Sequence, residues 1–332
     1  MKKLLSVILA LVMILSLSTV AFADTTTPSE PATYDDMETV TLTKEYKLTN
    51  AGTTSPAETF TFSALTCTDV KDAGVGVTKE NAPVPTIGDV SYTAGDAGSA
   101  NARKEITITL PKYEAVGVYT YTFTEIDGKT AGVTYRSEPI TLVVTVIEQD
   151  GKVRVAAVHT EETGGTKSGK FENTYSAGSL AVKKEVTGNM GDKDKKFDVT
   201  VTFAAPEGKT VNEAIGYVED GITKSIPTTA WEDGKASVKI ALKHQETITF
   251  NNIPYGVTYT VVEDTYEGYT TTYSGENGTV GSASAEATIT NDKGGNVDTG
   301  IVLDSMPYVL LLAVAAMGLA LLLTKKRASR ED

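Results

Sequence analysis

The sequence predicts an all-β fold, with two tandem Ig-like antiparallel β-sandwich domains between an N-terminal signal peptide and a C-terminal transmembrane helix. The first observation is a period of two: runs rich in Thr, Val, Tyr and Ile alternate polar and apolar residues, as in TVTLTKEYKL and GVYTYTFTE. The second is that Gly, Asn and Asp separate these runs at short intervals. Both features are typical of half-buried strands in a β-sandwich. Before the C-terminal apolar stretch, only a short piece near residues 211–215 favours a helix.

The N-terminus has the three parts of a secretory signal. Lys2 and Lys3 form a charged start, an apolar run covers residues 4–17, and the small residues of Ala21-Phe22-Ala23 precede Asp24. This order predicts a signal peptide over residues 1–23, cleaved between Ala23 and Asp24. A membrane anchor is the alternative, but the run is short for a span. Residues 24–37 are polar, contain proline and have no period, so we expect a flexible leader.

The C-terminus, residues 294–332, combines a polar spacer, an apolar stretch and a basic cluster. The stretch at 306–323 is just long enough to cross a bilayer, and Lys325-Lys326-Arg327 would hold the tail on the cytoplasmic side. We therefore expect a transmembrane helix over 306–323 and a membrane-inserted precursor.

The segment before this helix resembles the cell-wall sorting signals that sortase transpeptidases cleave. Its pentapeptide is Asn296-Val297-Asp298-Thr299-Gly300, where that family has Leu-Pro-x-Thr-Gly, so the first two positions depart from the pattern. The resemblance implies cleavage between Thr299 and Gly300 and transfer of the Thr299 carbonyl to an amine on peptidoglycan or on another subunit. A plain single-pass membrane protein is the alternative.

Composition excludes several classes of function. The formal net charge of −13 disfavours nucleic acid and anionic membrane surfaces as partners. Cys67 is the single cysteine, so no intramolecular disulfide is possible, and we expect a small core residue there. His159 and His244 stand apart from any cluster with ligand spacing, so we expect no metal and no cofactor. Nothing resembles a nucleophile elbow or a phosphate-binding glycine loop, which argues against an enzyme.

The chain between the two ends divides at small residues near Ser176-Ala177-Gly178, giving domains over residues 38–176 and 177–293. Strand parity places a charged residue on the apolar face of each first strand, because alternate residues share a face. Lys44 lies in phase with Leu42 in the first half, and Lys184 lies in phase with Val182 in the second. A buried lysine is costly unless it is paired or neutral, so both require an explanation.

Two further polar residues in each half have the same inward phase. Glu125 follows the buried face of GVYTYTFTE, and Asn173 is in phase with the aromatic residues of FENTY. In the second half, Glu263 ends GVTYTVVE and Asn291 ends AEATITN. Each domain thus presents one Lys, one Glu and one Asn, in the same order along the chain.

This constellation resembles the streptococcal pilin isopeptide-linkage domain family, in which such domains occur in tandem. The resemblance rests on LTKEYKL, YTFTE and FENTY in the first half, and on LAVKKEV, YTVVED and TITN in the second. It implies two self-formed Lys–Asn amide bonds with a glutamate as proton shuttle. The implied sets are Lys44, Asn173 and Glu125 in one domain, and Lys184, Asn291 and Glu263 in the other.

The chemistry is sensible for buried groups. Burial lowers the pKa of a lysine amine and so favours the neutral nucleophile, while a buried carboxyl can carry and return a proton. A buried Lys–Glu ion pair with Asn as a hydrogen-bond partner remains the alternative for each domain.

These features together predict a structural cell-surface protein, a pilin subunit that a sortase polymerises or anchors. The expected partners are a sortase, other pilin subunits or peptidoglycan, and the membrane before sorting. Lys167 is the candidate acceptor lysine, with Lys170 as its competitor. A monomeric anchored adhesin or stalk that binds a host or surface ligand is the alternative function.

Overall fold

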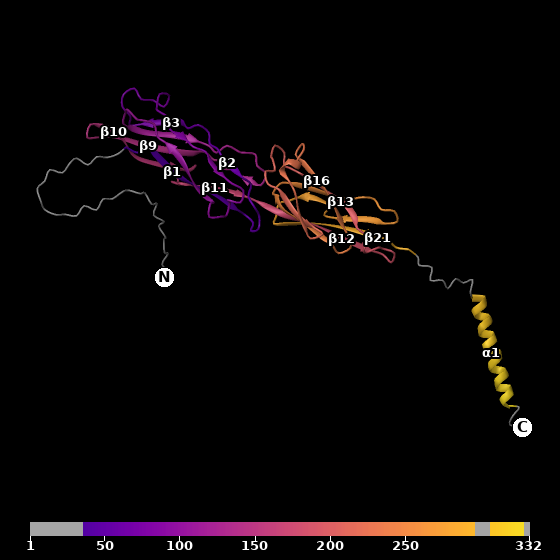
Figure 1. Ribbon diagram of the computed structural model, residues 1–332. Helices are drawn as coiled ribbons and strands as arrows, with labels where there is room; N and C mark the ends of the chain where they lie inside the picture. The colour runs from indigo at the N-terminus through magenta and orange to yellow at the C-terminus, as the bar shows by residue number, and fades with distance from the viewer. Residues whose placement is uncertain (1–35, 296–305, 329–332) are drawn as a thin grey trace, which may run out of the picture. The chain divides into compact units, whose positions relative to one another are not determined.

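The structure, a computed structural model, describes residues 36–295 and 306–328. The signal peptide and its cleavage site, most of the leader and the pentapeptide Asn296–Gly300 lie outside the described residues. The labels follow Figure 1.

The first domain has two principal sheets and one small one. The first sheet has, in spatial order, β4 (Thr86–Ile87), β6 (Arg103–Thr109), β1 (Thr39–Leu48), β11 (Lys170–Tyr175) and β8 (Val133–Thr134). The second sheet has β10 (Lys152–Glu161), β9 (Ile140–Gln149), β7 (Gly117–Phe123) and β3 (Thr66–Lys71). The small sheet pairs β2 (Glu58–Phe60) with β5 (Val90–Tyr92).

The second domain repeats this plan with two sheets. Their strands, in spatial order, are β15 (Ile222–Ile226), β14 (Ile215–Glu219), β17 (Thr247–Pro254), β12 (Ala177–Thr187), β21 (Ser284–Asp292) and β19 (Thr270–Ser274) in one, and β16 (Lys235–Leu242), β13 (Phe197–Ala204), β18 (Thr258–Glu263) and β20 (Asn277–Thr279) in the other. A short 3₁₀ turn, η1, covers Thr228–Ala230. The predicted all-β fold with two tandem sandwiches is therefore confirmed.

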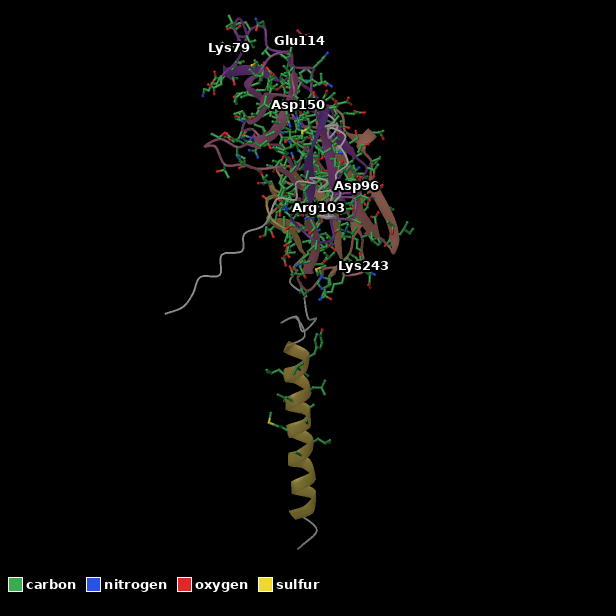
Figure 2. The ribbon with its side chains drawn as sticks, turned by 90° about the vertical axis from the view of Figure 1, so that its left-hand side faces the viewer. Lys79, Asp96, Arg103, Glu114, Asp150 and Lys243 are labelled. Atoms are coloured by element: carbon green, nitrogen blue, oxygen red, sulfur yellow. The ribbon has the colours of Figure 1, made fainter. Side chains whose placement is uncertain are left out.

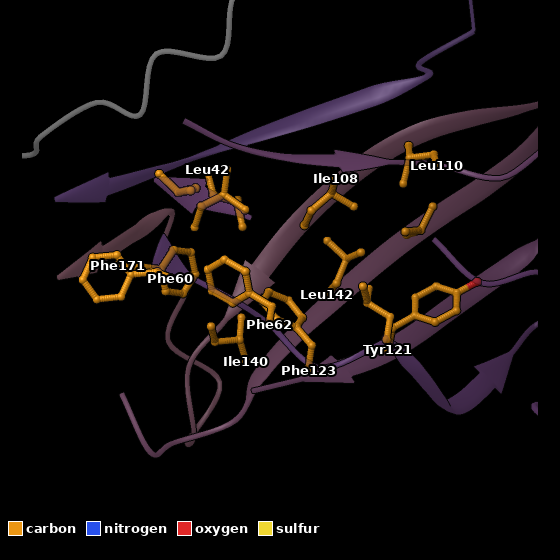
Figure 3. Close-up of a cluster of buried hydrophobic side chains, with 14 of the residues drawn as sticks. Leu42, Phe60, Phe62, Ile108, Leu110, Tyr121, Phe123, Ile140, Leu142 and Phe171 are labelled. Atoms are coloured by element: carbon orange, nitrogen blue, oxygen red, sulfur yellow. The ribbon is translucent and has the colours of Figure 1, made fainter. Parts of the chain in front are cut away.

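The core of each domain lies between its two principal sheets. In the first domain, Leu42 and Ile108 from one sheet meet Phe123 and Leu142 from the other (Figure 3). Strand β7 has a strictly alternating buried pattern, as the period of two predicts. The same alternation in β13 and β18 fills the core of the second domain.

One strand pair in each domain departs from the antiparallel pattern of the rest. Strand β1 pairs with β11 in parallel, and β12 pairs with β21 in parallel. In Figure 1 these first and last strands lie side by side. The chain enters a domain at one end and leaves it at the other, so its first and last strands run in the same direction. Parallel neighbours need a long crossover, and here the rest of the domain provides it.

The short helix favoured near residues 211–215 is absent among the described residues, and a β-hairpin follows there instead. Asp220 and Gly221 join β14 to β15, and both have positive φ, at 51° and 75°. Two such residues form the tight turn whose twist matches that of paired strands, which favours a hairpin over a helix.

Helix α1 covers Met306–Ala328 and includes the C-terminal apolar stretch. Within the part of the chain that the structure describes, no helix has the length and apolarity that a membrane crossing requires. The transmembrane segment over 306–323 stays a prediction.

Candidate functional site

The parallel strand pair places the lysine and the asparagine of each domain at equivalent positions. In the first domain, Tyr46 is opposite Asn173, so Lys44 lies two residues before the partner of the asparagine. In the second domain, Val186 is opposite Asn291, and Lys184 again lies two residues before that partner. Both pairs are therefore diagonal neighbours on the inner face of the sheet.

The first domain brings Lys44, Glu125 and Asn173 into direct contact in its core. Glu125 Oε1 lies 3.1 Å from Lys44 Nζ and accepts a hydrogen bond from Asn173 Nδ2 at 2.7 Å. Lys44 Nζ also donates to Asn173 Oδ1. All three residues are buried, and Lys44 is fully so. One carboxylate oxygen thus touches both the lysine nitrogen and the amide nitrogen.

Backbone groups of β8 and of the segment that follows it fix two of these side chains. Asn173 Nδ2 donates a second hydrogen bond to the carbonyl of Thr134 at 3.0 Å. The backbone N–H of Arg136 donates to Glu125 Oε2 at 3.2 Å. The amide group and the carboxylate are therefore held in place by groups outside the Lys–Glu–Asn set.

Aromatic rings surround the Lys44 amine. Its Nζ lies 4.3 Å from the ring centroid of Phe60 and 5.7 Å from that of Phe62, and both rings belong to the core cluster in Figure 3. Burial lowers the pKa of Lys44, against the opposing attraction of Glu125. The site therefore favours the neutral amine more than water does.

The second domain repeats the arrangement with a different division of contacts. Glu263 Oε2 lies 2.7 Å from Lys184 Nζ, without the alignment of a hydrogen bond, and Glu263 Oε1 accepts from Asn291 Nδ2 at 2.5 Å. Lys184 and Asn291 are fully buried. Lys184 Nζ lies 4.5 Å from the ring centroid of Phe197, and burial lowers its pKa while Glu263 opposes the shift.

Both sets have the parts that an amide exchange needs. A neutral amine is a nucleophile, and a carboxyl group in contact with both nitrogens can move a proton from the attacking nitrogen to the leaving one. In each domain the glutamate contacts both the lysine and the asparagine, which reduces the entropy cost of bringing the reacting groups together. The geometry is equally that of a buried ion pair with an amide partner, so the sites' chemistry stays a prediction.

Several residues of these sites were missed in the sequence. Thr134 and Arg136 contact the first site through backbone groups, and Phe60 and Phe62 approach Lys44 from β2 and the segment just after it. Strand parity predicts which face of the sheet a residue occupies. It does not predict backbone hydrogen bonds or ring contacts from other segments. The composition shows only that aromatic residues are available for the core.

The remaining predicted positions lie apart from the two sites. Cys67 is a half-buried free cysteine packed against the first core. Among the described residues no group of His, Cys, Asp or Glu is placed to hold a metal. Lys167 is exposed in the loop that joins β10 to β11, and its side chain has no ion pair within the described ranges. Lys170 Nζ, in contrast, lies 3.8 Å from Glu45 Oε2.

Comparison with known proteins agrees with this fold. Residues 40–176 match the family described as a Spy0128-like isopeptide containing domain, and residues 178–293 match a domain of unknown function. The crystal structure of the major pilin from Streptococcus pyogenes is similar with a TM-score of 0.53 and 27% identity, over 78% of this chain and 99% of that one. A mutant of the S. pyogenes major pilin gives a TM-score of 0.54 and 26% identity over the same shares.

A protein named pilin from S. pyogenes serotype M1 is 31% identical over 333 residues, which cover 92% of this chain and 95% of the relative. The similarity therefore extends over both β-sandwich domains and nearly the full length of each protein. The chain belongs to the family of pilins that carry a Spy0128-like isopeptide containing domain, and it is a structural subunit of a cell-surface pilus.

Proposed function

We propose that each domain of this pilin closes its own intramolecular isopeptide bond, Lys44 to Asn173 in the first domain and Lys184 to Asn291 in the second. The observation that carries the proposal is the contact of one buried glutamate with both nitrogens in each domain. The two independent copies share the same diagonal register on a parallel strand pair. A structural ion pair alone would not require the asparagine amide at the same place twice.

The proposed reaction conserves atoms and protons. The neutral lysine amine attacks the asparagine Cγ while the protonated glutamate donates its proton to the amide oxygen, and this proton returns to the glutamate when the carbonyl re-forms. A bond forms between Nζ and Cγ, the bond between Cγ and Nδ2 breaks, and the glutamate carries the proton from Nζ to the departing nitrogen. One ammonia leaves for each bond, and the glutamate is restored, so the protein acts only on its own chain.

Each bond would join the first and last strands of its domain. By analogy with disulfides, closing loops on the order of 100 residues stabilises a fold by about 4 to 5 kcal/mol on the chain-entropy account. Because the chain enters and leaves through these two strands, a pulling force would pass through the amide and bypass most of the sheet. That property suits a pilus subunit that lacks disulfides.

We further propose that a sortase joins the subunits, with the Thr299 carbonyl of one copy linked to Lys167 of the next. The amine of Lys167 is exposed and has no ion pair among the described residues, whereas that of Lys170 faces Glu45. Because an acceptor amine must be free to reach a second protein, these contacts favour Lys167.

The first prediction concerns the mass of the chain from Asp24 to Thr299. We expect the wild-type mass to be short by two ammonias, and Glu125→Ala and Glu263→Ala each to regain one, because each removes one proton carrier. Peptide mapping should identify the linked pairs, and circular dichroism should show that the variants fold.

Glu45→Ala and Glu219→Ala serve as matched controls. They remove a buried glutamate from the first and the second domain without touching the lysine or the asparagine, and both should keep the full deficit. A wild-type mass equal to the calculated one would reduce both sites to buried ion pairs.

A further inference from the structure

Arg136 is adjacent to the Lys–Glu–Asn set of the first domain, because its backbone contacts Glu125. Its backbone N–H donates to Glu125 Oε2 at 3.2 Å, and its guanidinium carbon lies 5.6 Å from the ring centroid of Phe171. The guanidinium Nε donates to the carbonyl of Glu138 at 3.3 Å, and Nη1 lies 3.5 Å from Glu162 Oε1. The side chain is only 20% exposed, so the cation is held in place and largely withdrawn from water.

Phe171 lies next to both the Arg136 guanidinium and the strand position of Lys44. In the parallel register Phe171 is directly opposite Lys44, and it is fully buried. A cation in this position opposes a second positive charge on the Lys44 amine, and the low polarity of the core screens that repulsion weakly. The guanidinium keeps its charge at every pH at which the protein is folded. Arg136 thus adds to the effect of burial in lowering the pKa of Lys44, while Glu125 opposes both.

Three other cations near Lys44 each lie closer to an acidic partner than Arg136 does to Glu162. Lys104, opposite Lys44 on β6, lies 3.1 Å from Asp96 Oδ2. Arg103, also on β6, lies 3.2 Å from Glu45. Lys47, on β1, lies 2.6 Å from Glu172. Arg136 has a longer ion-pair distance than these three, and its backbone also binds the proton carrier.

The second domain provides a natural comparison, because residues 177–293 contain no arginine. The backbone N–H of Glu263 donates to the hydroxyl of Tyr273 at 3.1 Å, and the charged group acting on Lys184 is Glu263. Lys195 lies over Tyr266 at 4.3 Å, and its ammonium is 5.4 Å from the Phe197 ring. Its contacts within the described residues include neither Glu263 nor Asn291.

We propose that Arg136 is a positioning residue for bond formation in the first domain: its backbone orients Glu125, and its guanidinium favours the unprotonated Lys44 amine. The first domain then closes its bond faster than the second under mildly acidic and neutral conditions. This inference rests on the Lys–Asn chemistry proposed above. It assigns Arg136 a role in the rate and pH dependence of the reaction, and leaves the bonded pair unchanged.

The test follows both bonds in one molecule. The chain from Asp24 to Thr299 is recovered unfolded and unlinked from inclusion bodies and refolded over a series of pH values. Samples are quenched with acid at intervals, and peptide masses give the linked fraction in each domain. The variants are Arg136→Gln, which removes the charge, and Arg136→Lys, which keeps it. Arg103→Gln is the control, since Arg103 is an exposed arginine of the same domain (Figure 2).

We expect Arg136→Gln to slow the Lys44–Asn173 bond by roughly several-fold at mildly acidic pH, because a larger fraction of the Lys44 amine is then protonated and cannot attack. The loss should shrink as the pH rises above the point where the amine is neutral in both proteins. Arg136→Lys should restore most of the rate, and Arg103→Gln should resemble the wild type. The bond of the second domain should form at the same rate in all four proteins.

A second measurement does not depend on bond formation. In Asn173→Ala, which cannot form the bond, an NMR titration of the Lys44 amine should show protonation at higher pH when Arg136→Gln is added. The role of Arg136 would be overturned if Arg136→Gln slowed the Lys44–Asn173 bond equally at every pH, or left its pH–rate profile unchanged. Slowing of bond formation in both domains would overturn it too. A wild-type chain that never loses ammonia would instead overturn the proposed function itself, so the two failures are distinguishable.

Discussion

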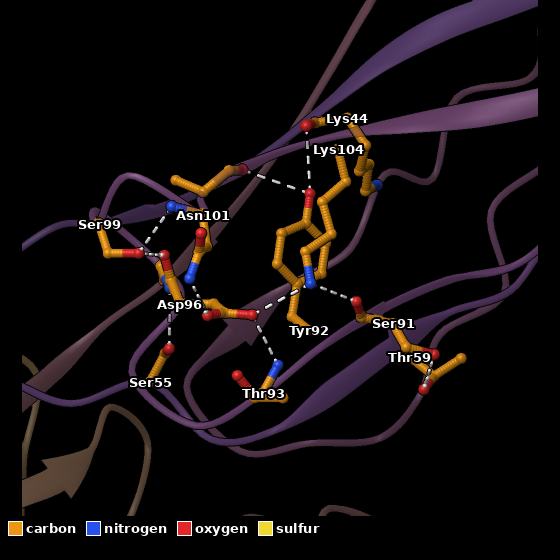
Figure 4. A network of polar contacts seen from close by, with 12 residues as sticks. Lys44, Ser55, Thr59, Ser91, Tyr92, Thr93, Asp96, Ser99, Asn101 and Lys104 are labelled. Atoms are coloured by element: carbon orange, nitrogen blue, oxygen red, sulfur yellow. Dashed lines mark hydrogen bonds and ion pairs between the residues drawn. The ribbon is translucent and has the colours of Figure 1, made fainter.

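Buried charges in this pilin have contrasting environments. Lys44 and Lys184 face aromatic rings and one carboxylate each, and burial lowers the pKa of both amines. Asp96 shows the opposite case, because hydrogen bonds and a lysine favour its charged form. Its carboxylate accepts from the backbone N–H of Thr93 at 2.8 Å, from Lys104 at 3.1 Å and from Asn101 at 3.4 Å (Figure 4). The same domain thus lowers the pKa of a lysine through burial at one position and that of an aspartate through hydrogen bonds at another.

The environment of Asp96 predicts a pH dependence of stability. The backbone N–H of Thr93, followed by Lys104, lowers the pKa of Asp96 to about 2. A carboxylate with a depressed pKa stabilises the fold above its ordinary pKa, and this contribution is lost as the pH falls toward the depressed value. Asp96→Asn should therefore lower the free energy of unfolding at neutral pH and match the wild type near pH 2. Urea unfolding over a pH series measures the difference.

Asp89→Asn is the control, since it removes an exposed carboxylate of the same domain that makes no hydrogen bond or ion pair in the described ranges. A difference between wild type and Asp96→Asn that stays constant down to about pH 2 would contradict the assignment.

At the scale of elements, the end of the second domain is held by a loop after β12. The Asn189 side chain donates to the Gly295 carbonyl at 2.7 Å and accepts from the Gly295 N–H at 2.9 Å. Met190 N–H donates to the Lys293 carbonyl at 3.0 Å, which continues the pairing beyond the end of β21. The chain is thus fixed to the residue that precedes the predicted sorting pentapeptide.

We expect Asn189→Ala to release the backbone at Gly295 while the rest of the domain stays folded. Each lost hydrogen bond is worth about 0.5 to 1.5 kcal/mol, so protection of the Gly295 amide from hydrogen exchange should fall by roughly tenfold. Asn251→Ala is the matched control, because within residues 36–295 the Asn251 side chain donates only to the nearby Thr249 carbonyl. Unchanged exchange at Gly295 would show that other contacts hold this segment.

At the scale of the whole molecule, two β-sandwich domains in tandem match the role of a pilus subunit. Within each domain, the first and last strands are neighbours and run in parallel. A bond between them would place the covalent path along the direction in which the chain passes through the domain. Polymerisation would then need one accessible amine outside these closed sites.

Polymer formation tests which amine this is. With a pilus-type sortase, the wild-type chain should give a ladder of covalent multimers on a denaturing gel. Lys167→Arg should abolish the ladder, because a guanidinium keeps the charge but is a poor nucleophile. Lys170→Arg should preserve it, because the Lys170 amine faces Glu45. The reverse pattern would assign the acceptor to Lys170, and ladders from both single variants would place it elsewhere.

The sequence by itself determined the strands and the face that each residue occupies. A period of two fixes which side chains point inward, so Lys44, Glu125 and Asn173 could be assigned to the core before any contact was known. The tight turn at Asp220-Gly221 was also a readable signal, although the hairpin that it forms was missed.

Only the tertiary structure decided which strands are neighbours and what surrounds the buried groups. The parallel pairing of β1 with β11 joins residues far apart in the chain, and its register depends on how the two sheets pack. The contacts of Arg136 with Glu125 and of Asn189 with Gly295 arise from loops, whose conformation has no periodic pattern. Local periodicity records the side on which a residue lies, whereas its partners depend on the packing of the whole domain.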